Sequence, residues 1–164
     1  LEVFPNDENL LYEYGLFLED SGEHSAALAI MQKIIALKPD NAAALNFVGF
    51  SWADKKVNLD QALEYIQRAI ALRPDNGYIL DSLGWVYFRL GKLDQAIKEL
   101  EAAVRLSPED AAILEHLADV YLEKGRVNDA LLTYRNALKF ATEDEQEKIR
   151  IQEKINALER QGIH

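Results

Sequence analysis

Residues 77–108 read GYILDSLGWVYFRLGKLDQAIKELEAAVRLSP. The stretch ends on Pro108, and the prolines of the chain, Pro5, Pro39, Pro74 and Pro108, follow one another at spacings of 34, 35 and 34 residues. A fixed period in this range is typical of an array of two-helix units rather than of one globular core. The sequence therefore predicts an all-α array of helix pairs, an architecture that offers a surface for holding another molecule.

Within one period, small and apolar residues recur at fixed places. Counting Gly77 as repeat position 1, positions 4, 7, 8, 11, 15, 20, 24 and 27 are Leu80, Leu83, Gly84, Tyr87, Gly91, Ala96, Leu100 and Ala103. Positions 4, 7, 8 and 11 fall on one helical stripe, so they are expected to face the partner helix. Glycine or alanine at position 8 indicates a close helix approach, because a mid-helix glycine costs about 1 kcal/mol against alanine.

Three more stretches, with position 1 at Glu8, Ala42 and Ala111, match at about eight positions each. The pattern resembles the tetratricopeptide repeat over roughly residues 6–142. The resemblance implies a right-handed α-solenoid of antiparallel helix pairs, and a non-enzymatic protein-binding module. The predicted organisation is the end of a preceding repeat at 1–5, repeats at 6–39, 40–74, 75–108 and 109–142, and a capping helix at 143–164.

Two places depart from the regular pattern. Between Ala53 and Asp60 the second repeat has one extra residue and no glycine, which predicts a longer turn, more simply a tolerated insertion than a functional loop. The chain opens on Leu-Glu-Val-Phe-Pro, similar to the last turn of a repeat's second helix, and without an initiator methionine. We therefore expect a segment of a longer repeat protein, so missing targeting signals carry no weight.

Composition excludes several classes of function. Apolar residues make up 49% of the 164 residues, enough for a continuous core, and no apolar run approaches a membrane span. The formal charge of −10 argues against nucleic acid or anionic lipid as a partner, because both need a basic surface. The absence of cysteine removes disulfides, thiolate metal sites and cysteine nucleophiles, without assigning a redox compartment.

Catalysis finds little support. Glu115, His116 and Asp119 share a helix at spacings that could supply metal ligands, but no further ligand is positioned by the sequence, which favours a polar helix surface. No nucleophile–base pair, cofactor fingerprint or zinc spacing is present. We therefore expect no enzyme activity, no cofactor and no metal.

Repeat positions 2, 5, 9 and 12 lie roughly 130° from the buried stripe. In stacked pairs they would line the concave groove. The predicted groove residues are Tyr12, Leu16, Asn46, Phe50, Tyr78, Asp81, Trp85, Phe88, Glu115 and Asp119.

Two interpretations of these residues stay open. Some aromatics, Phe88 first among them, would simply pack between adjacent first helices. Alternatively, Phe50, Trp85 and their neighbours form an exposed aromatic centre that anchors a peptide or helix. An acidic margin that includes Asp81, Glu115 and Asp119 would then favour a segment with a basic flank.

Comparison within the family argues against a chaperone adaptor that binds acidic tails, and it suggests a bacterial envelope adaptor. Co-chaperones that grip acidic heat-shock tails carry Lys, Asn and Arg at fixed groove positions, where this chain has Tyr12, Leu16, Phe47 and Tyr78. Residues 45–63 and 80–91 are similar to C-terminal repeats of proteobacterial outer-membrane lipoproteins, some of which are adaptors for a processing protease. That resemblance implies an envelope adaptor on the periplasmic side of the outer membrane, with a cytoplasmic location as the alternative.

A self-assembling scaffold is the second function that the sequence allows. A truncated array of helix pairs exposes apolar faces at its ends, so head-to-tail association is physically easy.

Overall fold

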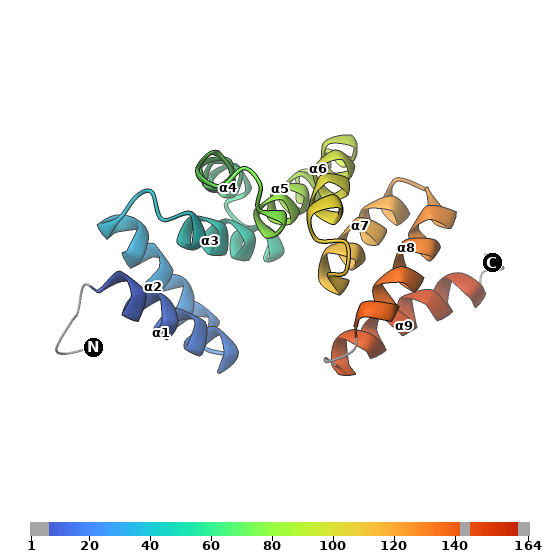
Figure 1. Cartoon of the computed structure of the whole chain (residues 1–164), viewed down its shortest axis with the longest axis horizontal. Coiled ribbons are helices and arrows are strands. Elements are labelled where there is room, and N and C mark those ends of the chain that lie inside the picture. Colours follow the sequence, from blue (N-terminus) through green and yellow to red (C-terminus); the bar gives the residue numbers. More distant parts are fainter. Residues whose placement is uncertain (1–6, 142–144, 161–164) are drawn as a thin grey trace. The chain divides into compact units, whose positions relative to one another are not determined.

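The computed structural model describes residues 7–141 and 145–160, and every regular element in these ranges is an α-helix (Figure 1). The first helices of the four pairs are α1 (Glu8–Asp20), α3 (Ala42–Asp54), α5 (Gly77–Arg89) and α7 (Ala111–Glu123). The second helices are α2 (His24–Leu37), α4 (Leu59–Leu72), α6 (Leu93–Leu106) and α8 (Val127–Phe140), and α9 (Glu145–Arg160) follows. Residues 1–5, predicted to end a preceding repeat, lie outside the described residues.

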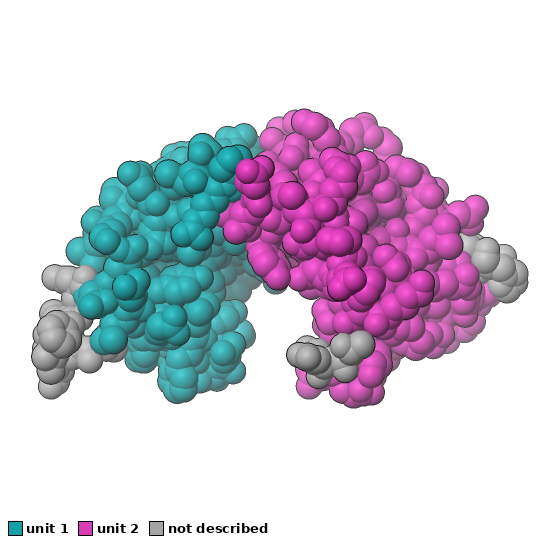
Figure 2. Space-filling view, in the orientation of Figure 1, with its two compact units in different colours: residues 1–74 teal, residues 75–164 magenta. Residues whose placement is uncertain are grey.

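The chain divides into two compact units, residues 1–74 and residues 75–164 (Figure 2). In unit 1, α1 packs on α2, α3 packs on α4, and α2 also contacts α3. In unit 2, α5 packs on α6, α7 packs on α8, α6 contacts α7, and α8 contacts α9. Within each unit, a second helix therefore joins its own first helix to the first helix of the next pair.

The starts of the first helices are fixed by side-chain caps. Asp7, Asn41, Asn76 and Asp110 each accept a hydrogen bond from the backbone N–H three residues on, at 2.8 to 3.1 Å. Such a cap satisfies one of the backbone donors that a helix start leaves unpaired. These four residues therefore fix where α1, α3, α5 and α7 begin.

The turns between paired helices use left-handed residues. Gly22, Gly91 and Gly125 have φ angles of 80°, 73° and 80°, as expected for glycine just after a helix end. In the second repeat Lys56 takes this place with a φ of 55°, and its N–H donates to the Ala53 carbonyl as Gly22 donates to Glu19. Asn58, with a φ of 48°, is the extra residue before α4. The predicted longer turn is present.

The helices of a pair approach closely where the sequence has small residues. A Cβ added to Gly49 would lie 2.7 Å from Ile66 Cδ1, and one added to Gly84 would lie 2.5 Å from Leu100 Cγ. The alanines at position 20, Ala27, Ala62, Ala96 and Ala130, are completely buried. In unit 2 the core continues into α9 through Ile151, Ile155 and Leu158, which pack with α8 residues such as Leu131 and Tyr134. The buried face of α9 thus extends the core of unit 2.

Candidate protein-binding surface

In unit 1, the predicted groove residues lie on the two first helices. Tyr12 and Leu16 come from α1, and Asn46 and Phe50 come from α3; all four are partly buried. The buried Oδ1 of Asn46 accepts no hydrogen bond from any described residue. These side chains therefore have some surface that another molecule could contact, and their role in binding stays a prediction.

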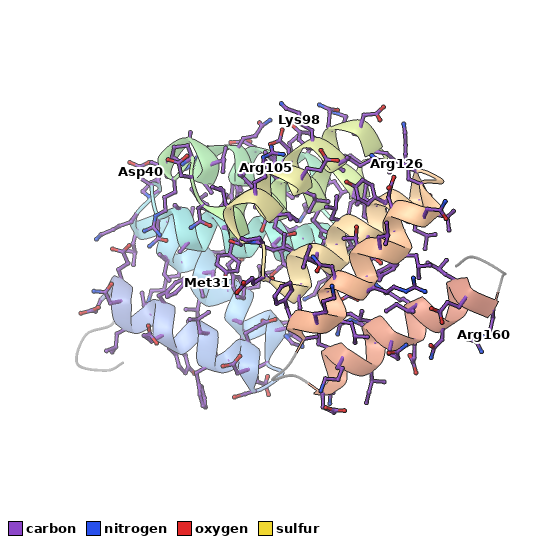
Figure 3. All side chains as sticks on the ribbon, turned by 45° about the vertical axis from the view of Figure 1, so that its right-hand side comes forward. Met31, Asp40, Lys98, Arg105, Arg126 and Arg160 are labelled. Atoms are coloured by element: carbon purple, nitrogen blue, oxygen red, sulfur yellow. The ribbon has the colours of Figure 1, made fainter. Side chains whose placement is uncertain are left out.

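A cavity of about 650 Å³ opens at the N-terminal ends of α1 and α3. Its lining residues are Glu8, Asn9, Tyr12, Glu13, Asp40, Asn41, Ala42, Ala43, Leu72 and Arg73. Asp40 lies in the turn between α2 and α3 (Figure 3). The cavity thus combines one aromatic side chain with three carboxylates and one guanidinium.

The carboxylates around this cavity differ in their surroundings. Glu8 pairs with Lys38 and accepts a hydrogen bond from Asn41, and these contacts hold the pKa of Glu8 below its ordinary value. Glu13 and Asp40 are exposed to solvent. Two exposed carboxylates beside Tyr12 make this end of unit 1 attractive to a cationic group.

In unit 2, the structure corrects the predicted exposed aromatic centre. Trp85 has only 7% of its surface exposed, and Asp81 and Glu115 have 7% and 4%. Phe88 is partly buried, whereas Tyr78 is 61% exposed. The interpretation of Trp85 as an exposed anchor is therefore wrong, and packing between first helices applies to Trp85 more than to Phe88.

Trp85 is buried because it is part of an aromatic and charged cluster between α5 and α7. Its ring stacks on His116 at 4.3 Å between centroids and contacts Phe88 at 5.0 Å, and the Arg89 guanidinium lies 4.6 Å from its centroid. His116 Nδ1 lies 2.8 Å from a carboxylate oxygen of Asp81. Burial lowers the pKa of His116, but the charge of Asp81 and its hydrogen bond raise it more, so the net pKa lies above its ordinary value.

The predicted acidic margin is neutralised in unit 2. Glu115 accepts hydrogen bonds from the Arg150 guanidinium at 2.7 to 3.2 Å, and Lys154 Nζ lies 2.7 Å from it. Burial raises the pKa of Glu115, but the hydrogen bonds from Arg150 and Lys154 hold it below its ordinary value. Asp119 pairs with Lys154 at 2.6 Å and accepts a hydrogen bond from Tyr134. These carboxylates hold α9 on α7 and cannot be counted as a free acidic rim for a partner.

These contacts follow a rule that the sequence analysis missed. Asp81 meets His116, Glu115 meets Arg150, and Asp119 meets Lys154, and in each case the partner lies 35 residues further along. Since the repeat length is 34, an acid at position 5 or 9 of one first helix meets position 6 or 10 of the next. The sequence contained this signal as an acid at position 5 of one repeat and a base at position 6 of the next repeat. Because α9 follows the same spacing, it occupies the place of another first helix.

The same face of α7 carries the three residues with metal-ligand spacing, Glu115, His116 and Asp119. His116 faces Asp81, whereas Glu115 and Asp119 both pair with Lys154. No group of three ligand-type side chains that could hold a metal ion occurs among the described residues. Ion pairs between helices therefore explain these three residues without a metal.

The arrangement defines a helical-repeat scaffold. The chain belongs to the tetratricopeptide repeat family: a family model described as tetratricopeptide repeat matches residues 12–77 and 82–145. A second model of the same description matches residues 57–105. The predicted family and fold class are confirmed.

One curated relative carries the same description, and solved structures share the fold. A TPR repeat-containing protein of Pseudomonas aeruginosa is 37% identical over 93 residues, which is 57% of this chain and 16% of that protein. Among solved structures, MamA 41-end from Desulfovibrio magneticus RS-1 has a TM-score of 0.68 at 23% identity, covering 86% of this chain and 79% of its own. A crystal structure of MamA has a TM-score of 0.66 at 26% identity, covering 92% and 85%. This chain thus spans about a sixth of the length of the curated relative.

Among residues 7–141 and 145–160, no helix combines the length and the apolar character needed to cross a bilayer.

Proposed function

We propose that this chain is a non-enzymatic interaction scaffold that holds a peptide or helical segment of another protein on the exposed face of its first helices. The observation that carries the proposal is the cavity of about 650 Å³ in unit 1, where Tyr12 lies beside the exposed carboxylates Glu13 and Asp40. An aromatic side chain in a polar-rimmed hollow is the usual anchor of a peptide groove. The exposed carboxylates favour a segment that carries Lys or Arg.

In this proposal, the basic flank of the partner lies against unit 1. In unit 2 the acids at position 5 are buried and paired, so they cannot supply attraction to a partner. In unit 1 position 5 is occupied by Tyr12, and the acids lie around it. We therefore place the cationic part of the bound segment near the N-terminal ends of α1 and α3.

We further propose an envelope role for the parent protein. It rests on the resemblance of residues 45–63 and 80–91 to repeats of outer-membrane lipoproteins. The bacterial origin of the 37% identical relative supports that context. In this proposal the scaffold presents a protease, or the substrate of one, to a larger assembly.

Site-specific crosslinking tests the binding surface. A photoreactive phenylalanine analogue would replace Tyr12 in the full chain, and a matched variant would carry the analogue at Leu132, which is exposed on α8. We expect the Tyr12 variant to crosslink a protein from bacterial envelope extract through a segment containing Lys or Arg, and Glu13→Gln with Asp40→Asn to reduce the yield. Equal crosslinking at both positions would place the binding surface elsewhere.

Self-association is the second candidate function. The apolar side chains Leu10, Tyr14 and Phe17 are exposed on α1, and exposed apolar patches on helical repeats commonly mark contact surfaces. Sedimentation of the full chain over a concentration series tests it, because a self-assembling scaffold gains mass with concentration and an adaptor stays monomeric.

A further inference from the structure

The outer face of α1 carries an apolar stripe made of Leu10, Tyr14 and Phe17. Their exposed fractions lie between 37% and 63%, and the rings of Tyr14 and Phe17 stack with an interplanar angle of 16°. These residues occupy repeat positions 3, 7 and 10 of the first helix. Three apolar side chains on one helix face in water are unfavourable unless another surface covers them.

The same positions of α7 show what covers such a stripe. Ile113, Leu117 and Val120 are at most 5% exposed, and α7 contacts both helices of the preceding pair, α5 and α6. In unit 1, Ala44 and Val48 of α3 are likewise completely buried, and α3 packs on α2. Positions 3, 7 and 10 thus belong to the interface between one helix pair and the next, and α1 carries that interface with no described helix on it.

We propose that the stripe on α1 is covered by another tetratricopeptide helix pair, stacked in series ahead of α1, whose first helix has a basic residue opposite Glu13. Glu13 occupies position 6 of α1, as His116 does in α7 and Arg150 in α9. His116 and Arg150 face acids of the preceding first helix, Asp81 and Glu115. At α1 the sign is reversed, because position 6 is the acid. An acid at position 5 of the docking helix would therefore repel it, and Lys or Arg would pair with it. Asp40 then remains the exposed carboxylate beside Tyr12 for the segment of the proposed function.

A second copy of this chain does not supply the required surface. In a second copy, the helix available for stacking on α1 is α9, which occupies the place of a first helix. It has Ile149 at position 5 and Glu153 at position 9. Stacked in register, these would put an apolar side chain opposite Glu13 and a carboxylate next to Phe17. Among the described residues, no second helix follows α9 to cover Leu10 and Tyr14. The length of the curated relative, of which this chain covers 16%, leaves room for further helix pairs of the required kind.

The test extends the chain by one helix pair of its own sequence. A copy of residues 75–107 would replace residues 1–4, so that Pro5 follows the copied second helix as Pro108 follows α6. In the Asp version, the copy keeps the Asp that corresponds to Asp81. In the Lys version, the copy alone carries Asp81→Lys. A control in the α1 stripe, Leu10→Ile, Tyr14→Leu and Phe17→Val, reproduces the α7 residues and reports whether the copied pair folds and stacks.

Hydrogen exchange of the α1 amides is the readout. We expect the Lys version to slow α1 exchange by about tenfold or more relative to the Asp version, and Glu13→Lys to reverse the order of the two. The proposal would be overturned if the control stripe docks the copy while the native stripe docks neither version, or if the Lys and Asp versions protect α1 equally. It would also be overturned if the unextended chain forms a dimer at neutral pH that Phe17→Gln abolishes, because the face would then belong to a second copy.

Discussion

At the scale of single residues, position 8 of the first helices sets how closely the two helices of a pair approach. A Cβ at Gly84 would lie 2.5 Å from Leu100 Cγ and 3.2 Å from the Ala96 carbonyl oxygen, so a branch point and a backbone atom would both have to move. A Cβ at Gly15 would meet the Met31 Cε methyl at 2.7 Å, which is the far end of a flexible side chain. The two glycines therefore differ in what an added methyl would displace.

We expect Gly84→Ala to lower the free energy of unfolding by about 1–3 kcal/mol, because overpacking outweighs the gain in helix propensity. We expect Gly15→Ala to leave it unchanged or raise it by up to about 1 kcal/mol, since Met31 can move aside. Urea unfolding followed by circular dichroism measures both. Equal effects of the two substitutions would show that side-chain flexibility at the contact does not decide the outcome.

At the scale of elements, α9 is held to α7 by a buried carboxylate. Glu115 is 4% exposed and its charge is balanced by Arg150 and Lys154, both from α9. Removing one partner of a buried ion pair is costly, because the remaining charge loses its compensation.

We expect Arg150→Leu to lower the free energy of unfolding by about 1–3 kcal/mol at neutral pH. The pKa of Glu115 lies below its ordinary value in the folded chain, so its contribution is present above the unfolded pKa of 4.5 and is lost as the pH falls through the folded pKa. The difference between the native chain and Arg150→Leu should therefore shrink in acid. Thermal melts at neutral and acidic pH check this, with Glu115→Gln added to Arg150→Leu as the control that should recover part of the loss.

The elements were the part of the fold that the sequence predicted well. Helix starts at Asn41, Asn76 and Asp110, and turns at Gly22, Gly91 and Gly125, follow from local chemistry that a single repeat contains. The spacing of proline and glycine predicts which helices pair, because the same local signals recur in each pair.

The candidate site was predicted less well, because its contacts join different pairs. Helical periodicity placed Trp85 and Phe50 on the same stripe, yet Trp85 is buried and Phe50 only partly so. The difference comes from what stands 31 to 35 residues further along: His116 stacks on Trp85 and also binds Asp81. One helix's periodicity gives a direction for each side chain but says nothing of what the next helix places there.

At the scale of the whole molecule, charge opposes contact between copies. The formal net charge is −10 at pH 7 and the isoelectric point is about 4.8. Repulsion between like-charged copies is strong at neutral pH and disappears near the isoelectric point, where exposed apolar side chains can meet.

We therefore expect light scattering from the full chain to rise as the pH approaches 4.8, and to rise less in Phe17→Gln, because Phe17 is 63% exposed. The exposed α8 residue Leu132, changed by Leu132→Gln, is the comparison that separates the α1 stripe from apolar exposure in general. Identical scattering curves for the three proteins would show that neither apolar side chain drives the association.

The residues at position 8 also bear on how such an array lengthens over evolutionary time. Repeat genes grow when a unit is duplicated, and a duplicated pair can join only where the helix ahead of it has room for a second helix. Position 8 is a small residue in four first helices: Gly15 in α1, Gly49 in α3, Gly84 in α5 and Ala118 in α7. In α9 it is Gln152, with Lys148 one turn before it. New pairs can therefore be copied into the interior of the array at little cost. A second helix could pack closely on α9 only after Gln152 is replaced by a small residue, as at position 8 of the other first helices.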